Sequence, residues 1–175
     1  ALFAPEIAAL AGAGDVAVVS PDPGGVKRAQ LLREVLEKQW RRPVGQAFID
    51  KRRSAGVVSG DLLVGDVKGA TVVVIDDLIA SGGTMARAAA AARSNGASRV
   101  IACAAHGLFT GNARATLAAS PIHLTLVTDT VPPFRLSPDF VASHLKVISA
   151  APLFAGCIRS LCGGASITKL LGDEE

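Results

Sequence analysis

Two apolar runs without polar alternation constrain the fold of this chain most strongly. Val16–Val19 and Val72–Ile75 are rich in β-branched residues, and neither run has a polar residue at every second position. A strand with one face in water alternates apolar and polar side chains, whereas a parallel strand covered on both faces is apolar throughout. The runs therefore predict a doubly wound α/β fold, in which a mainly parallel sheet is flanked by helices.

Short strands and Ala/Leu-rich helical stretches alternate along the rest of the chain. We expect strands at Val16–Ser20, up to Ile49, at Thr71–Asp76, Arg99–Ala104 and Ile122–Thr128, and near Val147, and helices at Ala1–Leu10, Val26–Lys38, Gly83–Asn95, Asn112–Ala118 and Ala151–Leu161. A length of 175 residues fits a single domain over residues 1–175. Ligands of such sheets bind beyond the carboxyl ends of the strands, where the winding reverses, so the segments after the strands are the candidate sites.

Composition excludes several classes of function. Eighteen basic and fifteen acidic residues give a formal charge of +3, which is too small to indicate a nucleic-acid surface. The apolar runs are far shorter than the roughly 20 residues that span a bilayer. Cys103, Cys157 and Cys162 form no CxxC pair, as is typical of reduced thiols. We therefore expect a cytoplasmic protein with no nucleic-acid partner and no membrane partner.

The segment after the strand Thr71–Asp76 combines two acids with a phosphate-binding pattern. Its residues are Asp76, Asp77, Leu78, Ile79, Ala80, Ser81, Gly82, Gly83 and Thr84. The glycines, the hydroxyls and the start of a helix suit an anion, whereas carboxylates would repel it and suit sugar hydroxyls or hydrated Mg2+. A phosphorylated sugar satisfies both halves of the segment. The alternative is an acidic turn that caps a helix.

Two further segments carry charge after predicted strands. Asp22, Pro23, Gly24 and Gly25 open a helix with a glycine pair and one possible metal-binding acid, which would suit pyrophosphate with Mg2+. Asp50-Lys51-Arg52-Arg53 is followed by small residues, so we expect a mobile catalytic loop over about 50–61. Its cations could neutralise a transferring phosphoryl chain. The alternative for this triplet is a solvated basic turn.

The order SPDPGG, DKRR, DDLIASGGT resembles the second half of ribose-phosphate pyrophosphokinases, and the similarity runs from about Ala1 to Leu170. The resemblance implies a fold of the type I phosphoribosyltransferase kind. It assigns ribose 5-phosphate binding to Asp76, Asp77, Ala80, Ser81, Gly82, Gly83 and Thr84, pyrophosphate binding to Asp22, Pro23, Gly24 and Gly25, the Mg2+ cofactor to Asp22, and catalysis to Lys51 and Arg53. The implied reaction transfers the diphosphoryl group of Mg-ATP to the 1-hydroxyl of ribose 5-phosphate, giving phosphoribosyl pyrophosphate and AMP.

The sequence departs from the family pattern at a few positions and leaves two other functions open. Many members carry an acid at the position of Ala80 and Thr at that of Ser81, and Pro23 removes one N–H donor. The adenine-binding segment and the metal-binding histidine of the family belong to an amino-terminal half that has no counterpart here. We therefore expect a carboxyl-terminal half, inactive without the other half, in a homo-oligomer. The alternatives are a phosphoribosyltransferase or a non-catalytic synthetase-associated subunit, and the presence of Lys51 and Arg53 favours an enzyme.

Overall fold

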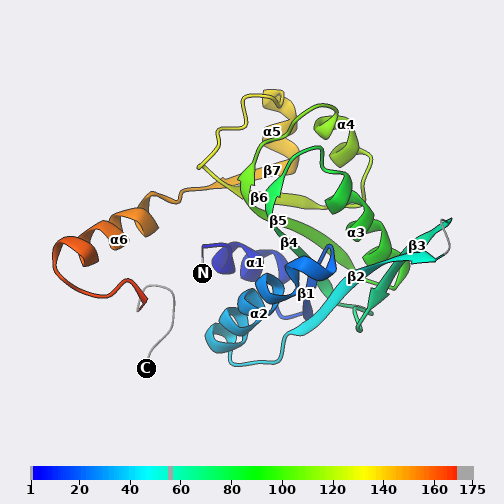
Figure 1. The fold of residues 1–175 in the computed structure, drawn as a ribbon, viewed down its shortest axis with the longest axis horizontal. Coiled ribbons are helices and arrows are strands. Elements are labelled where there is room, and N and C mark those ends of the chain that lie inside the picture. Colours follow the sequence, from blue (N-terminus) through cyan, green and yellow to red (C-terminus); the bar gives the residue numbers. More distant parts are fainter. Residues whose placement is uncertain (1, 55–56, 169–175) are drawn as a thin grey trace.

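The computed structural model describes residues 2–54 and 57–168, with residues 51–54 and 57–61 described by their backbone alone. In chain order the elements are α1 (Ala4–Ala11), β1 (Val16–Ser20), the 3-10 turn η1 (Pro23–Gly25), α2 (Val26–Trp40), β2 (Gly45–Ser54), β3 (Val57–Val64), β4 (Thr71–Ile79), α3 (Gly83–Ser94), β5 (Arg99–Gly107), α4 (Ala113–Ala118), β6 (Leu124–Thr128), α5 (Pro138–His144), β7 (Leu145–Ile148) and α6 (Ala151–Cys162). Figure 1 shows one central sheet with helices on both sides.

The sheet has seven strands in the order β3-β2-β1-β4-β5-β6-β7. Every pairing is parallel except that of β2 with β3, which confirms the predicted mainly parallel α/β fold. The apolar run of β1 is buried at all five positions and that of β4 at its first five, as two-sided cover by helices requires.

Two apolar clusters fill the space between the sheet and its helices. On one face α1 and α2 contribute Ile7, Leu32 and Leu36, which pack on β1 and β4. On the other face α3, α4 and α5 contribute Met85, Leu117 and Phe140. All three cysteines are free, and burial raises the pKa of the Cys103 thiol. Among the described residues, no helix is long and apolar enough to cross a membrane.

Several boundaries differ from the sequence prediction. The strand expected to end near Ile49 continues to Ser54 and pairs antiparallel with β3, so the described part of the expected loop over about 50–61 is a β-hairpin. β4 continues past Asp76 to Ile79, because it stays paired with β5 as far as Gly107. Helix α5 was not predicted, since its seven residues are too few to show a helical period.

Helix α6 lies apart from the sheet and its covering helices, as the orange ribbon in Figure 1 shows. None of its residues is buried. Phe154, Ile158 and Leu161 follow one another at helical spacing and are 57%, 60% and 64% exposed. An exposed apolar stripe of this kind is typical of a surface that another part of an assembly covers.

The exposure of α6 predicts that its apolar side chains contribute little to the stability of this chain. Phe154→Ala should change the free energy of unfolding by less than about 0.5 kcal/mol in urea denaturation. The reason is that Phe154 is mostly exposed to solvent, so its removal loses little buried apolar contact. The matched control is Phe140→Ala, whose ring is 6% exposed in the core and whose loss should destabilise clearly more. Equal losses for both variants would contradict the exposed position of α6.

Candidate functional site

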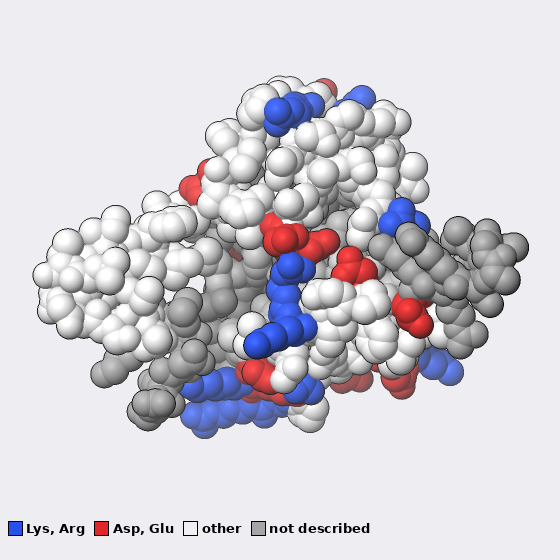
Figure 2. All heavy atoms as spheres, in the orientation of Figure 1, with Lys and Arg blue, Asp and Glu red and all other residues white. Residues whose placement is uncertain are grey.

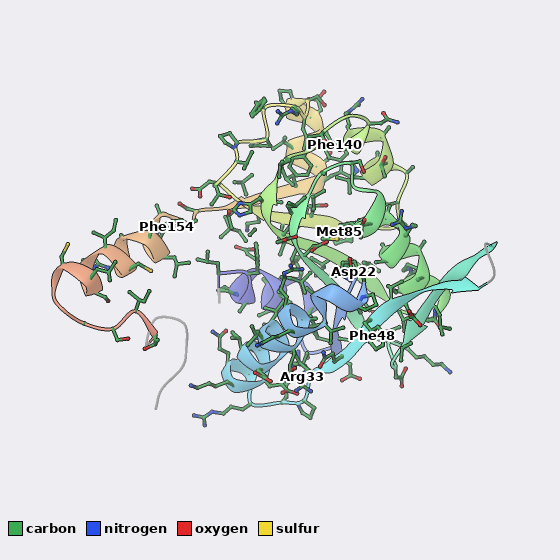
Figure 3. All side chains as sticks on the ribbon, in the orientation of Figure 1. Asp22, Arg33, Phe48, Met85, Phe140 and Phe154 are labelled. Atoms are coloured by element: carbon green, nitrogen blue, oxygen red, sulfur yellow. The ribbon has the colours of Figure 1, made fainter. Side chains whose placement is uncertain are left out.

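The two predicted ligand-binding segments meet where the winding of the sheet reverses. From β1 the chain first adds β2 on one side and later adds β4 on the other side, so β1 and β4 are neighbours. η1 follows the carboxyl end of β1, and the turn Ala80–Gly82 follows that of β4. This crevice is the usual ligand site of open α/β sheets. Figure 3 labels Asp22 and Met85, which mark the two segments.

The segment after β4 forms a hollow of about 140 Å3, lined by residues 76–85. The segment that follows β5 holds the end of β4 by hydrogen bonds: Ile79 O accepts them from the N–H groups of Leu108 and Phe109. Ala80 O likewise accepts one from the N–H of Thr110. These bonds hold the backbone at Ile79 and Ala80, and the lining continues into the amino-terminal end of α3, where the helix dipole favours an anion.

Seven residues predicted to bind ribose 5-phosphate line this hollow together. They are Asp76, Asp77, Ala80, Ser81, Gly82, Gly83 and Thr84. The acids lie at the end of β4, and the glycines and hydroxyl residues lie at the start of α3. The geometry thus brings possible acceptors for sugar hydroxyls, at the end of β4, and possible phosphate donors, at the start of α3, into one small hollow. Ala80 contributes only a methyl group to its wall.

Gly82 gives the turn its shape. It is the residue before α3 and has a positive φ of 78°, and a Cβ built there would lie 3.0 Å from Leu117 Cγ. Gly82→Ala should therefore lower the free energy of unfolding by about 2 kcal/mol, measured in urea, through both backbone strain and overlap.

The matched control for this prediction is Gly69→Ala. Gly69 has a similar φ of 74° but nothing within 4 Å of a built Cβ, so its substitution should cost only about 1 kcal/mol of backbone strain. If the two variants lost equal stability, overlap with Leu117 would not contribute.

The segment after β1 is stabilised by hydrogen bonds within itself, one of them to the side chain of Asp22. Asp22 Oδ1 accepts a hydrogen bond of 3.0 Å from the N–H of Gly25, and Ser20 Oγ donates one of 2.5 Å to Asp22 O. The Gly25 amide thus has a partner within the chain, and pyrophosphate binding by residues 22–25 stays a prediction. Among the described residues, no group of three or more His, Cys, Asp or Glu side chains could hold a metal ion. Asp22 alone suits only Mg2+ that keeps waters and substrate oxygens as its other ligands.

Arg28 connects the two segments and was not among the predicted site residues. Its Nη1 lies 2.6 Å from Asp76 Oδ1 and its Nη2 lies 3.4 Å from Asp77 Oδ2. Figure 2 shows acidic and basic side chains meeting near the centre of the face in view. The only signal in the sequence is that a cation follows the glycine pair by three residues.

The two carboxyl groups differ in acidity. Burial raises the pKa of Asp76, although the N–H of Asp77 and the charge of Arg28 act to lower it. A hydrogen bond from the Asp76 carboxyl lowers the pKa of Asp77, and the Arg28 charge adds to this effect. As the pH falls, Asp76 therefore takes up a proton first, and Asp77 remains anionic over a wider range.

The predicted catalytic cations lie on the β2–β3 hairpin. The backbone of Lys51 pairs with that of Asp61, and the backbone of Arg53 pairs with that of Val58, with a register shift between the two pairs. The side chains of both cations lie outside the described residues, so their catalytic role stays a prediction. β2 lies beside β1 in the sheet. The β2–β3 hairpin extends beyond the carboxyl end of β1, which is the end that η1 follows.

Two histidines have structural partners. His106 Nδ1 lies 2.8 Å from Thr130 Oγ1 at the ends of β5 and β6. His144 stacks on Phe140 with ring centroids 4.6 Å apart, and its Nδ1 lies 2.6 Å from Ser143 Oγ. Each of these two side chains thus has a partner within the described part of the chain.

The doubly wound, mainly parallel sheet with a lined hollow at its winding reversal places the chain among α/β proteins that bind a ligand at this point of the sheet. A family model described as the phosphoribosyl synthetase-associated domain matches residues 58–172. The chain belongs to this family of ribose-phosphate pyrophosphokinases and related proteins, as its motifs indicate.

Similar proteins carry the same family name. The chain is 43% identical to a ribose-phosphate pyrophosphokinase of Caldanaerobacter subterraneus over 89% of its length and 47% of that protein. It is 37% identical to one of Granulibacter bethesdensis over 97% of its length and 52% of that protein. A crystal structure of phosphoribosylpyrophosphate synthetase from Mycobacterium smegmatis superposes with a TM-score of 0.76 at 35% identity, over 94% of this chain and 50% of the other. The chain thus spans about half the length of these relatives.

Proposed function

We propose that this chain forms the carboxyl-terminal half of a ribose-phosphate pyrophosphokinase. The observation that carries the proposal is the hollow after β4, which combines two carboxylates with the glycines and hydroxyls at the start of α3. The reaction transfers the diphosphoryl group of ATP to the 1-hydroxyl of ribose 5-phosphate. The product, phosphoribosyl pyrophosphate, is a precursor in nucleotide biosynthesis.

Different residues of the hollow bind different parts of the sugar phosphate. The 5-phosphate binds at the amino-terminal end of α3, where backbone N–H groups and the hydroxyls of Ser81 and Thr84 can donate to it. Asp76 and Asp77 accept hydrogen bonds from the ribose hydroxyls. The sugar is thereby fixed at two ends, and fixing a reactant in this way removes much of the entropic barrier to reaction.

Transfer then requires charge neutralisation more than covalent help from the protein. A bond forms between the 1-oxygen of the sugar and the β-phosphorus, the bond from that phosphorus to the oxygen of the α-phosphate breaks, AMP leaves, and the hydroxyl proton is released. Lys51 and Arg53 neutralise the negative charge on the transferring group. Asp22 would hold Mg2+, which supplies further positive charge at the pyrophosphate when it is bound.

The half-length match and the exposed helix α6 support a proposal about the assembly. We propose that the complete protein is a cytoplasmic homo-oligomer, with ATP recognised by the half that this chain does not contain. The exposed stripe of Phe154, Ile158 and Leu161 supports contact with another part of that assembly.

Calorimetric titration of the 175-residue chain with ribose 5-phosphate and, separately, with ATP tests the proposal, both in Mg2+. Binding of the sugar phosphate with little or no affinity for ATP is the expected result. Absence of sugar-phosphate binding would contradict the assignment of the hollow and favour a non-catalytic subunit. Tight binding of ATP alone would contradict the assignment of ATP to the other half.

A further inference from the structure

Arg28 joins two parts of the site that are far apart in the sequence. Its side chain leaves the first turn of α2, and Nη1 lies 2.6 Å from Asp76 Oδ1, which belongs to a residue 48 positions further along. Nη2 lies 3.4 Å from Asp77 Oδ2. One guanidinium therefore contacts both carboxylates at the end of β4.

The surroundings of the pair explain why a cation is needed there. The Asp76 side chain is only 19% exposed and stands next to the more exposed Asp77. A poorly solvated carboxylate beside a second carboxylate is repelled by it, and it either turns away or takes up a proton. The positive charge of Arg28 opposes both outcomes, so it keeps the two oxygens in a fixed orientation.

Gly25 leaves room for this contact. A Cβ built on Gly25 would lie 3.2 Å from Arg28 Nη1 and 2.6 Å from Ser20 Oγ. A side chain at this position would therefore collide with Ser20 and crowd Arg28, while the Gly25 amide donates to Asp22 Oδ1. The segment after β1 is thus shaped around the arginine.

We propose that Arg28 is a positioning residue of the ribose 5-phosphate site. Its guanidinium holds Asp76 and Asp77 in the orientation in which they accept the ribose hydroxyls, and it ties the segment after β1 to the segment after β4. The planar fork of arginine can engage two carboxylates at once, whereas the ammonium group of lysine acts as a single point charge. This inference rests on the proposed function, because it takes ribose 5-phosphate as the ligand.

A double-mutant cycle on the affinity for ribose 5-phosphate, measured by calorimetry in the 175-residue chain, tests the inference. Arg28→Ala should weaken binding by about 10-fold, and Arg28→Lys should restore part of the loss. In the Asp76→Ala background, Arg28→Ala should cause a clearly smaller loss than in the unmodified chain, because only Asp77 then remains for the arginine to position. Arg33→Ala is the control, since it removes the same charge from α2 at a pair with Glu37.

Each outcome separates the inference from the proposed function. Additive losses in the cycle would show that Arg28 binds the ligand itself and would overturn the positioning role, as would an unchanged affinity in Arg28→Ala. If the unmodified chain does not bind the sugar phosphate, the proposed function fails instead. Thermal melting checks the folding of each variant. Should Arg28→Ala fail to fold, Arg28→Lys alone is decisive: a loss of about threefold supports the inference, and no loss overturns it.

Discussion

Replacing Lys51 or Arg53 with alanine in the complete protein is expected to lower kcat by about 100-fold or more. The KM for ribose 5-phosphate should change by less than about threefold, because the role proposed for the two cations is on the transferring diphosphoryl group and not on the bound sugar. Steady-state kinetics with both substrates measures the two parameters separately. An interaction made only in the transition state lowers kcat and kcat/KM together, which is the pattern expected here.

Arg52→Ala is the matched control for the hairpin cations. It removes the same charge from the same strand at the position between Lys51 and Arg53. Arg52→Ala should lower kcat much less than the other two substitutions do. If the three residues contributed only general positive charge, their substitutions would have equal effects. Comparable losses at all three positions would contradict the specific assignment. A rise in the KM for ribose 5-phosphate without loss of kcat would place the cations at the sugar.

Asp77→Ala should weaken the binding of ribose 5-phosphate by about 10-fold to 100-fold. The carboxylate is 61% exposed at the mouth of the hollow, and its lowered pKa keeps it an anionic acceptor for ribose hydroxyls. A charge-assisted hydrogen bond of this kind contributes about 1.5 to 3 kcal/mol to binding. Calorimetric titration of the purified chain measures the loss directly, and an unchanged affinity would remove Asp77 from the site.

Asp66→Ala controls for the loss of a negative charge. Asp66 lies in the turn before β4, at the opposite end of that strand, where its Oδ1 accepts a hydrogen bond of 3.0 Å from the N–H of Lys68. Its substitution should leave the affinity for ribose 5-phosphate unchanged. A loss as large as that of Asp77→Ala would indicate a long-range effect of net charge in place of a contact.

The central strands could be predicted from the sequence because burial on both faces leaves a local signal. The apolar runs of β1 and β4 show it plainly. β3 has the sequence VVSGDLLV, in which Ser59, Gly60 and Asp61 interrupt the apolar residues, so no continuous local pattern marks it and its pairing with β2 makes it a strand. The extension of β4 to Ile79 likewise depends on its partner β5, which lies far along the chain. Pairing of this kind is a tertiary effect that residue patterns do not report.

In the candidate site, too, local features could be predicted from the sequence and tertiary contacts could not. The segment from Asp76 to Thr84 could be found because its acids, glycines and hydroxyls lie in one continuous stretch before a helix. The contact of Arg28 with Asp76 could not, because it requires β1 and β4 to be neighbours and the side chain of α2 to turn toward them. The hydrogen bond between Asp22 and Gly25 also depends on the 3-10 turn that the backbone adopts.

The strand order has a consequence for the nascent protein. β1 lies between β2 and β4, and Val16 pairs with Thr71, so the middle of the sheet cannot close until the ribosome has translated the whole hairpin and β4 has left the exit tunnel. Until then one edge of β1 lacks its hydrogen-bonded neighbour β4 and remains open to wrong pairing. A translational pause while β4 is still inside the exit tunnel should therefore increase misfolding, whereas a pause after α3 has emerged should not, because α3 then already packs on β4.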